Sequence, residues 1–201
     1  MPKDTSLPPK SSKIVSYSSA ETKILGEGLA PFLRAGDVIS FSGDLGTGKT
    51  TFIQGLAKGL GIEGRVTSPT FTLIKEYHPK IQDPSSKLQV QGPRSQDKNL
   101  KPETCSLKPV GLGLYHFDLY RLRSFEELYD LGYEEYFGGP GITVIEWGEK
   151  IAPLLLEVFL EIKLTQQLSE NVREIEIIPH GSRWERLVPE WLKKSRLKQE
   201  R

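Results

Sequence analysis

The chain has 201 residues, with 27 Lys and Arg against 26 Asp and Glu, so its formal net charge is +1. This balance argues against a dedicated nucleic-acid binder that is held by its own basic field, which needs a clear excess of positive charge. Contact with RNA through a partner remains compatible with it. The length fits one domain, with room for an insertion. A hydrophobic fraction of 37% is low for a compact fold and predicts that part of the chain is not packed.

Cysteine usage and apolar runs limit the cellular setting. The single cysteine, Cys105, cannot form an internal disulfide, so nothing indicates an oxidising compartment. The longest apolar runs are far shorter than the roughly 18 residues of a spanning helix, and we expect no membrane association. Residues 1–13 are rich in Pro, Ser and Lys and are interpreted as the flexible leader of a cytoplasmic protein. An organelle transit peptide, which is also basic and Ser-rich, is the alternative.

Hydrophobic patterning predicts strands alternating with helices. Segments that are continuously apolar, or rich in β-branched and aromatic residues, indicate strands, and apolar residues spaced by three and four indicate helices. The predicted elements, in chain order, are a strand over 14–16, a helix from Ser19 to Phe32, a strand over 38–42, a helix from Thr50 to Gly59, strands over 70–77 and 114–120, a helix from Ser124, strands over 142–146, 158–164 and 173–179, and a short helix from Ser182.

Two polar segments stand apart from this pattern. Residues 78–113 hold five prolines and no aromatic residue. Such a composition cannot offset the entropy of ordering so long a loop, which predicts a disordered or loosely packed insertion between two adjacent strands. Cys105 lies in it and is interpreted as an incidental thiol. Residues 193–201 form a basic tail, interpreted as a solvated helix end, with an arm that contacts RNA or a partner as the alternative. One domain over 14–192 remains.

The strongest motif is GDLGTGKT over residues 43–50, which matches G-x-x-x-x-G-K-[ST] between a predicted strand and a predicted helix. Its glycines allow backbone N–H groups to point at phosphate oxygens, and the helix adds the positive end of its dipole. In such a loop the lysine contacts the β and γ phosphates and the threonine hydroxyl contacts Mg²⁺. The predicted nucleotide-binding residues are Asp44, Leu45, Gly46, Thr47, Gly48, Lys49, Thr50 and Thr51.

Acidic residues close two predicted strands. Asp118 and Glu146 stand at strand ends, and carboxylates at the carboxyl ends of sheet strands face the ligand crevice in open α/β folds. We expect them to serve the metal and the attacking water, whereas exposed strand-end charges are the alternative. Trp147 follows Glu146 and is interpreted either as a wall of the site or as a core residue. Arg121 either neutralises phosphate charge or forms a surface ion pair.

A hydroxyl-rich segment, Thr67-Ser68-Pro69-Thr70, lies between the motif helix and the next predicted strand. Loops of this kind sense the γ-phosphate in related folds, which predicts a switch-like role for Ser68 and Thr70. An ordinary turn that leads into a strand is the alternative interpretation.

Four blocks in order, GDLGTGKTTF, VTSPTFTLIKEY, YHFDLYRL and IEWGEKI, resemble the motifs of the TsaE (YjeE) family, the small ATPases of bacterial tRNA threonylcarbamoyladenosine biosynthesis. The similarity runs from about Val15 to Pro179. It implies an α/β P-loop NTPase fold with a mostly parallel central sheet flanked by helices, ATP and Mg²⁺ as cofactors, and slow intrinsic hydrolysis stimulated in complex. It also implies that the protein works with TsaD–TsaB, which modify the adenosine next to the anticodon of ANN-decoding tRNAs, and meets tRNA only through these partners.

The resemblance assigns roles by motif position. It implies a catalytic group of Lys49, Asp118 and Glu146, a magnesium site at Thr50 and Glu146, a site wall at Trp147, a switch-like loop at Ser68 and Thr70, and a nucleotide contact at Arg173. The chain departs from the family where it joins the TFTLIKEY and YHFDLYRL strands through residues 78–113 instead of a short turn. This insertion leaves the site motifs intact and bears on partner docking.

Two other functions are compatible with the phosphate-binding motif. In a small-molecule kinase, Arg121 and Arg123 would serve a phosphoryl acceptor, although the LYRLRS segment is too short for a kinase lid. A nucleotide-gated binding module with negligible hydrolysis is the second alternative. The chain holds no NKxD-type guanine motif and no LSGGQ signature, which argues against a GTPase and an ABC-type ATPase.

Overall fold

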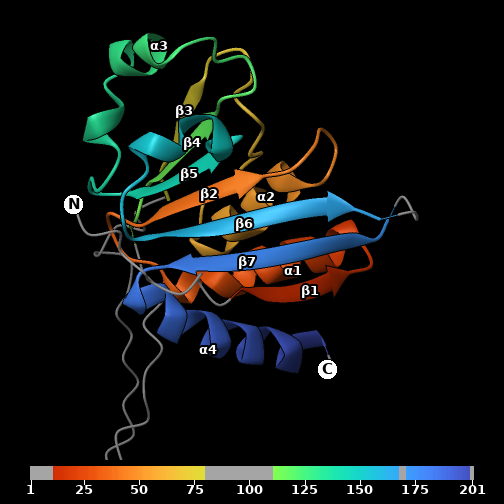
Figure 1. Cartoon of the computed structure of the whole chain (residues 1–201). Helices are drawn as coiled ribbons and strands as arrows, with labels where there is room; N and C mark the ends of the chain where they lie inside the picture. The colour runs from red at the N-terminus through yellow and green to blue at the C-terminus, as the bar shows by residue number, and fades with distance from the viewer. Residues whose placement is uncertain (1–10, 80–110, 168–170, 200–201) are drawn as a thin grey trace, which may run out of the picture.

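The computed structural model describes residues 11–79, 111–167 and 171–199 (Figure 1). The strands are β1 (Ser12–Ser16), β2 (Val38–Ser42), β3 (Ile74–Tyr77), β4 (Leu114–Asp118), β5 (Ile142–Glu146), β6 (Phe159–Gln166) and β7 (Arg173–His180). The helices are α1 (Ser19–Leu29), α2 (Lys49–Gly59), α3 (Phe125–Asp130) and α4 (Ser182–Gln199), with 3₁₀ turns η1 (Ala30–Phe32), η2 (Tyr133–Glu135) and η3 (Gly148–Leu154). Each strand and helix predicted from the sequence is therefore present; β2 and β5 have the predicted ends, and the other elements begin or end at different residues.

The sheet has the strand order β1-β7-β6-β2-β5-β4-β3 and is mixed. Its middle is parallel, because β2 pairs in parallel with β5 and β6, and β4 with β5. The outer pairs β1–β7, β6–β7 and β3–β4 are antiparallel. The prediction of a mostly parallel sheet is therefore wrong. A parallel pair needs a crossover connection, whereas strands that follow one another in the chain, as β3–β4 and β6–β7 do, can pair directly in antiparallel register.

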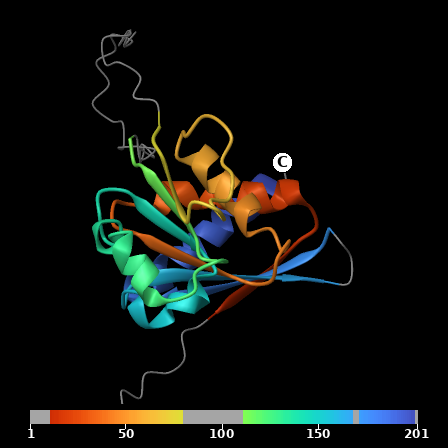
Figure 2. The same ribbon diagram turned by 90° about the horizontal axis from the view of Figure 1, so that it is seen from above.

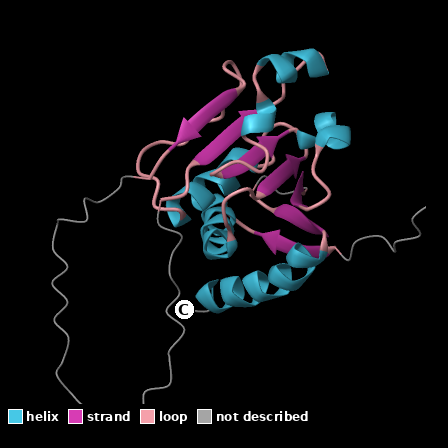
Figure 3. Ribbon diagram, turned by 90° about the vertical axis from the view of Figure 1, so that its left-hand side faces the viewer, coloured by secondary structure: helices cyan, strands magenta, loops and turns pink. Residues whose placement is uncertain are grey.

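The sheet separates two apolar layers (Figures 2 and 3). Helices α1, α2 and α4 cover one face, and α3, η2 and η3 lie on the other. Successive strand side chains point to opposite faces, so neighbouring residues of β2 enter different layers. Ile39 and Phe41 join the core under α1 and α2, and Val38 joins the core on the far side.

Strand β3 is shorter than predicted. A turn occupies its expected first half, where the Thr72 and Leu73 amides both donate to the Pro69 carbonyl, at 2.9 and 2.8 Å. Leu73 then has φ = +61°, a left-handed conformation that interrupts an extended strand. Strand β4 likewise ends at Asp118 and not at residue 120.

Helix α4 is longer than predicted, with 18 residues. Trp184, Val188, Trp191 and Ser195 are buried along it. Their spacing of four, three and four residues forms one helical stripe, which packs against α1 and β7. The helix continues to Gln199, so residues 193–199 of the predicted basic tail are helical.

The ends of the predicted insertion lie on neighbouring strands, since Tyr77 of β3 is the register partner of Leu114 of β4. Residues 80–110, with Cys105, lie outside the described residues, as do residues 1–10 of the predicted leader. In the parts of the chain that the structure describes, no helix is long and apolar enough to cross a membrane.

Candidate functional site

The loop over residues 43–48 joins β2 to α2 at the carboxyl edge of the parallel strands. Gly43 and Gly48 adopt φ values of +125° and +101°, a region that other residues rarely enter. A Cβ on Gly43 would also lie 2.1 Å from the Leu164 carbonyl oxygen. Helix α2 begins directly after this loop, at Lys49, so the loop and the positive end of the helix dipole face the same space.

Lys49 lies inside the loop with only 4% of its surface exposed. Its Nζ donates to the carbonyl oxygens of Gly43 and Asp44, at 2.6 and 2.8 Å, and lies 4.0 Å from the centre of the Trp147 ring. Burial lowers the pKa of the Lys49 ammonium, and the negative charge of Glu146 acts in the opposite direction. A buried cation at a helix N-terminus fits a polyphosphate group.

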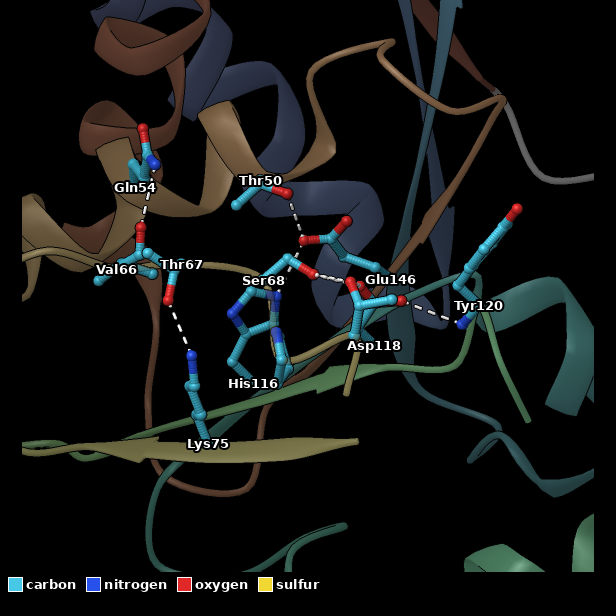
Figure 4. A network of polar contacts seen from close by, with 12 residues as sticks. Thr50, Gln54, Val66, Thr67, Ser68, Lys75, His116, Asp118, Tyr120 and Glu146 are labelled. Atoms are coloured by element: carbon cyan, nitrogen blue, oxygen red, sulfur yellow. Dashed lines mark hydrogen bonds and ion pairs between the residues drawn. The ribbon is translucent and has the colours of Figure 1, made fainter. Parts of the chain in front are cut away.

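Three polar side chains share the sheet face that α2 covers. Leu114 and Val144 enter the core beneath α1 and α2. Alternate residues of a strand point to the same face, so His116 and Asp118 lie on the same face as Leu114, and Glu146 lies on the same face as Val144. Asp118 and Glu146 are register partners across β4 and β5. All three residues are buried, with at most 4% of their surface exposed, and they bring two carboxyl groups and an imidazole to the loop (Figure 4).

Glu146 contacts the GDLGTGKT motif through Thr50. The Thr50 hydroxyl donates to Glu146 Oε1 at 2.7 Å, and His116 Nε2 lies 3.0 Å from the same oxygen (Figure 4). A hydroxyl and a carboxylate are the hard oxygen ligands that Mg²⁺ prefers. In the described part of the chain no group of three or more His, Cys, Asp or Glu is placed to hold a metal. One or two carboxylates with substrate phosphates and waters form the usual Mg²⁺ site, so the residues present fit this ion.

Asp118 holds the hydroxyl-rich segment. Its Oδ2 accepts hydrogen bonds from the hydroxyls of Ser68 and Thr70, the latter at 2.6 Å, and its Oδ1 accepts from the Tyr120 amide at 3.0 Å. Lys75 Nζ also donates to Thr67 Oγ1 at 2.8 Å (Figure 4). The segment is therefore attached to the site through the acid at the end of β4.

A cavity of about 310 Å³ lies between the loop and these side chains. Its lining comprises eleven of the fourteen residues predicted from the sequence, together with Tyr120: Leu45, Gly46, Gly48, Lys49, Thr50, Thr51, Ser68, Thr70, Asp118, Glu146 and Trp147. Tyr120 and Trp147 form one wall, with ring centres 5.2 Å apart. Its size lies at the lower end of the range for small-molecule sites.

Three predicted nucleotide contacts do not line the cavity. Arg173 Nε donates to the Thr47 carbonyl at 2.9 Å, and the Thr47 hydroxyl donates to the Asp44 carbonyl at 2.9 Å. These contacts support the backbone of the loop from β7. Arg121 is also outside the cavity, with its guanidinium 4.4 Å from the centre of the exposed Phe71 ring.

Comparison with known proteins decides the family. The model described as "Threonylcarbamoyl adenosine biosynthesis protein TsaE" matches residues 16–88 and 105–175. The chain belongs to the TsaE family. The protein of Bacillus subtilis (strain 168) named tRNA threonylcarbamoyladenosine biosynthesis protein TsaE is 37% identical over 170 residues, which cover 85% of this chain and 87% of that protein. The equally named protein of Treponema pallidum (strain Nichols) is 36% identical over 165 residues, with coverages of 82% and 98%.

A solved structure agrees with this assignment. The crystal structure of Bacillus subtilis YdiB is similar with a TM-score of 0.67 and 32% sequence identity, and the match covers 94% of this chain and 99% of that one. The two ranges that match the TsaE model contain every site residue named above, and the gap between them, 89–104, falls inside the predicted insertion. The site therefore belongs to the part of the chain that matches the family model.

Sequence reasoning missed two residues that complete the site. His116 contacts Glu146, and Tyr120 lines the cavity. The signal for His116 was its position two residues before Asp118 on a strand, which places both side chains on the same face. Tyr120 lies two residues after Asp118, beyond the end of β4, where the alternation of side chains between the two faces of a strand no longer holds.

Thr70→Val should lower the free energy of unfolding by about 1.5–3 kcal/mol, since a hydrogen bond to a charged group contributes that much. Thr72→Val is the matched control, because it makes the same change in the same loop, where the hydroxyl is 3.5 Å from the Pro69 carbonyl. Urea unfolding of both variants measures the difference. Equal losses would show that the Thr70–Asp118 contact does not anchor the loop.

Proposed function

We propose that this chain is the ATP-binding and ATP-hydrolysing subunit required for threonylcarbamoylation of the adenosine next to the anticodon in ANN-decoding tRNAs. It acts with TsaD–TsaB and does not transfer the group itself. The observation that carries the proposal is the contact of Thr50 with Glu146 beside a buried Lys49, in a chain of the TsaE family. The relatives named above are tRNA threonylcarbamoyladenosine biosynthesis proteins.

The loop supplies the phosphate contacts. Lys49 Nζ now donates to the carbonyls of Gly43 and Asp44, and we propose that it exchanges these acceptors for β and γ phosphate oxygens. The exchange favours a bound polyanion, because a buried ammonium is better compensated by phosphate charge than by carbonyl dipoles. Arg173 keeps the loop backbone in place through Thr47, so in this proposal it supports nucleotide binding indirectly.

The two acids have separate roles in the proposal. Thr50 and Glu146 would hold Mg²⁺, which supplies positive charge against the phosphate oxygens. Asp118 already accepts hydrogen bonds from three donors, so it orders the loop that carries Ser68 and Thr70. That loop borders the cavity beside Glu146, and we propose that it responds to the terminal phosphate. Lys49, Asp118 and Glu146 thus form the proposed catalytic group.

The near-neutral charge of the chain supports the proposal that its partners bind the tRNA. A net charge of +1 gives little long-range attraction for tRNA, so the proposal assigns tRNA binding to TsaD–TsaB and places the protein in the cytoplasm with them.

Lys49→Met should remove nucleotide-dependent stabilisation. A ligand present at a hundred times its Kd stabilises the folded state by about 2.7 kcal/mol, and the variant should show none of this gain with ATP and Mg²⁺. Thermal unfolding with and without nucleotide measures it. Lys58→Met is the matched control, since Lys58 is exposed at the other end of α2 and pairs with Glu27. A normal shift in Lys49→Met, or none in the wild type, would contradict nucleotide binding at this loop.

A further inference from the structure

His116 is a buried polar side chain that the proposed chemistry has not used. Its exposed fraction is 0%, and it does not line the cavity. Nε2 lies 3.0 Å from Glu146 Oε1, whereas Nδ1 has no hydrogen-bond partner among the described residues. An unpaired buried nitrogen costs free energy, and an apolar side chain would avoid this cost. A histidine at this position therefore calls for a reason other than core packing.

We propose that His116 is a positioning residue that orients the Glu146 carboxylate for Mg²⁺, an inference that rests on the function proposed above. Glu146 Oε1 accepts from two donors, the Thr50 hydroxyl and the His116 imidazole. Thr50 is also a proposed magnesium ligand. Because Thr50 is itself expected to touch the ion, His116 is the side-chain donor on Glu146, among the described residues, that can hold the carboxylate without being a ligand.

The residues around His116 on this face of the sheet do not donate a hydrogen bond to the Glu146 carboxylate. Its register partner on β5 is Val144, and Glu146 lies two residues further along that strand. Diagonal neighbours of this kind are within reach of long or aromatic side chains. Leu114 and Ile142, which precede on the same face, are apolar and donate no hydrogen bond. Asp118, the register partner of Glu146 on β4, is itself a hydrogen-bond acceptor, so the imidazole is the β4 side chain that donates to the Glu146 carboxylate.

Affinity for ADP in the presence and absence of Mg²⁺ tests the proposal. We compare the wild-type full chain with His116→Leu and His116→Gln by titration calorimetry. Without Mg²⁺ the three proteins should bind ADP equally. The tightening caused by Mg²⁺ should fall by about 10–100-fold in His116→Leu, the range found when a residue that orients a metal ligand is lost. His116→Gln should restore most of it, because its amide nitrogen reaches the position of the imidazole Nε2.

His180→Leu is the matched control. His180 Nε2 lies 3.0 Å from Glu161 Oε2, the same pairing of an imidazole with a carboxylate at the same distance, on β7 and β6 and outside the cavity. In His180→Leu, Mg²⁺ should tighten ADP binding as much as it does in the wild type. If His116→Leu does not fold, His116→Asn replaces it, because its shorter amide cannot reach Glu146.

The outcomes separate this inference from the proposed function. An unchanged Mg²⁺ effect in His116→Leu, or equal effects in His116→Gln and His116→Asn, would overturn the positioning role while nucleotide binding stands. A wild-type chain that binds no ADP would instead refute the proposed function. A loss of ADP affinity that is the same with and without Mg²⁺ would identify His116 as a residue of general structural importance and would also overturn the inference.

Discussion

Glu146→Gln should lower ATP turnover on the order of 100-fold, the effect of removing one electrostatic contact from a reaction site. The substitution keeps the size of the side chain and removes its charge, and Glu146 is buried against Thr50 at 2.7 Å. Nucleotide binding should persist, because the phosphate contacts come from the loop and from Lys49. Steady-state phosphate release by the variant, with and without TsaD–TsaB, measures the effect.

Glu149→Gln is the matched control for this prediction. Glu149 is exposed three residues further along the chain, and its charge also acts on Lys49, but it does not line the cavity. Its turnover should remain close to that of the wild type. Full turnover in Glu146→Gln would remove Glu146 from the catalytic group, and negligible turnover in the wild type would favour a nucleotide-gated binding module.

Gly55→Ala should lower the free energy of unfolding by about 3 kcal/mol, at the upper end of the usual cost of overpacking. Helices α1 and α2 meet where Gly55 faces the backbone of Lys23. A Cβ at residue 55 would lie 2.0 Å from the Lys23 carbonyl oxygen and 2.7 Å from its carbon. Main-chain atoms cannot rotate away, so the helices must separate. Because α2 carries Lys49 and Thr50, nucleotide affinity should fall with stability.

Gly28→Ala is the control, because it makes the same substitution in α1 where the nearest atom belongs to a side chain of α4. Its added methyl group would meet the Ser195 hydroxyl at 2.7 Å, and a side chain can shift. Alanine also stabilises a helix by about 1 kcal/mol relative to glycine, which offsets the cost of moving the Ser195 side chain. Urea unfolding should therefore place Gly28→Ala near the wild type and Gly55→Ala far below it. Similar losses in the two variants would show that the close approach of α1 and α2 does not constrain residue 55.

Local signals in the sequence predicted the backbone around the 43–50 loop and the strand that ends in Glu146. The motif over 43–50 carries its own turn and helix start, and β5 was predicted with its observed ends because Ile142–Glu146 is nearly all apolar up to its acid. Left-handed Leu73 shows the limit of this approach. Its conformation is set by two amides that share the Pro69 carbonyl, and strand propensity contains no information on that turn.

Contacts between distant residues were harder to predict. The sheet was expected to be mostly parallel because the family resemblance implied it, whereas the partners of β1 and β7 depend on the whole strand order. The role of His116 depends in the same way on β4 and β5 being neighbours in a particular register. Asp118 was predicted as an acid of the site, but its hydrogen bonds to Ser68 and Thr70 required the loop to fold back onto β4.

Multiple-turnover modification of tRNA tests the central claim most directly. The wild-type chain is added to matching TsaD–TsaB with tRNA, threonylcarbamoyl-adenylate, ATP and Mg²⁺, and modified tRNA is counted per TsaD–TsaB complex. We predict repeated turnover with the wild-type chain, and its loss when ATP is omitted or Lys49→Met is used. An unchanged yield of modified tRNA with and without the chain would contradict the proposed function.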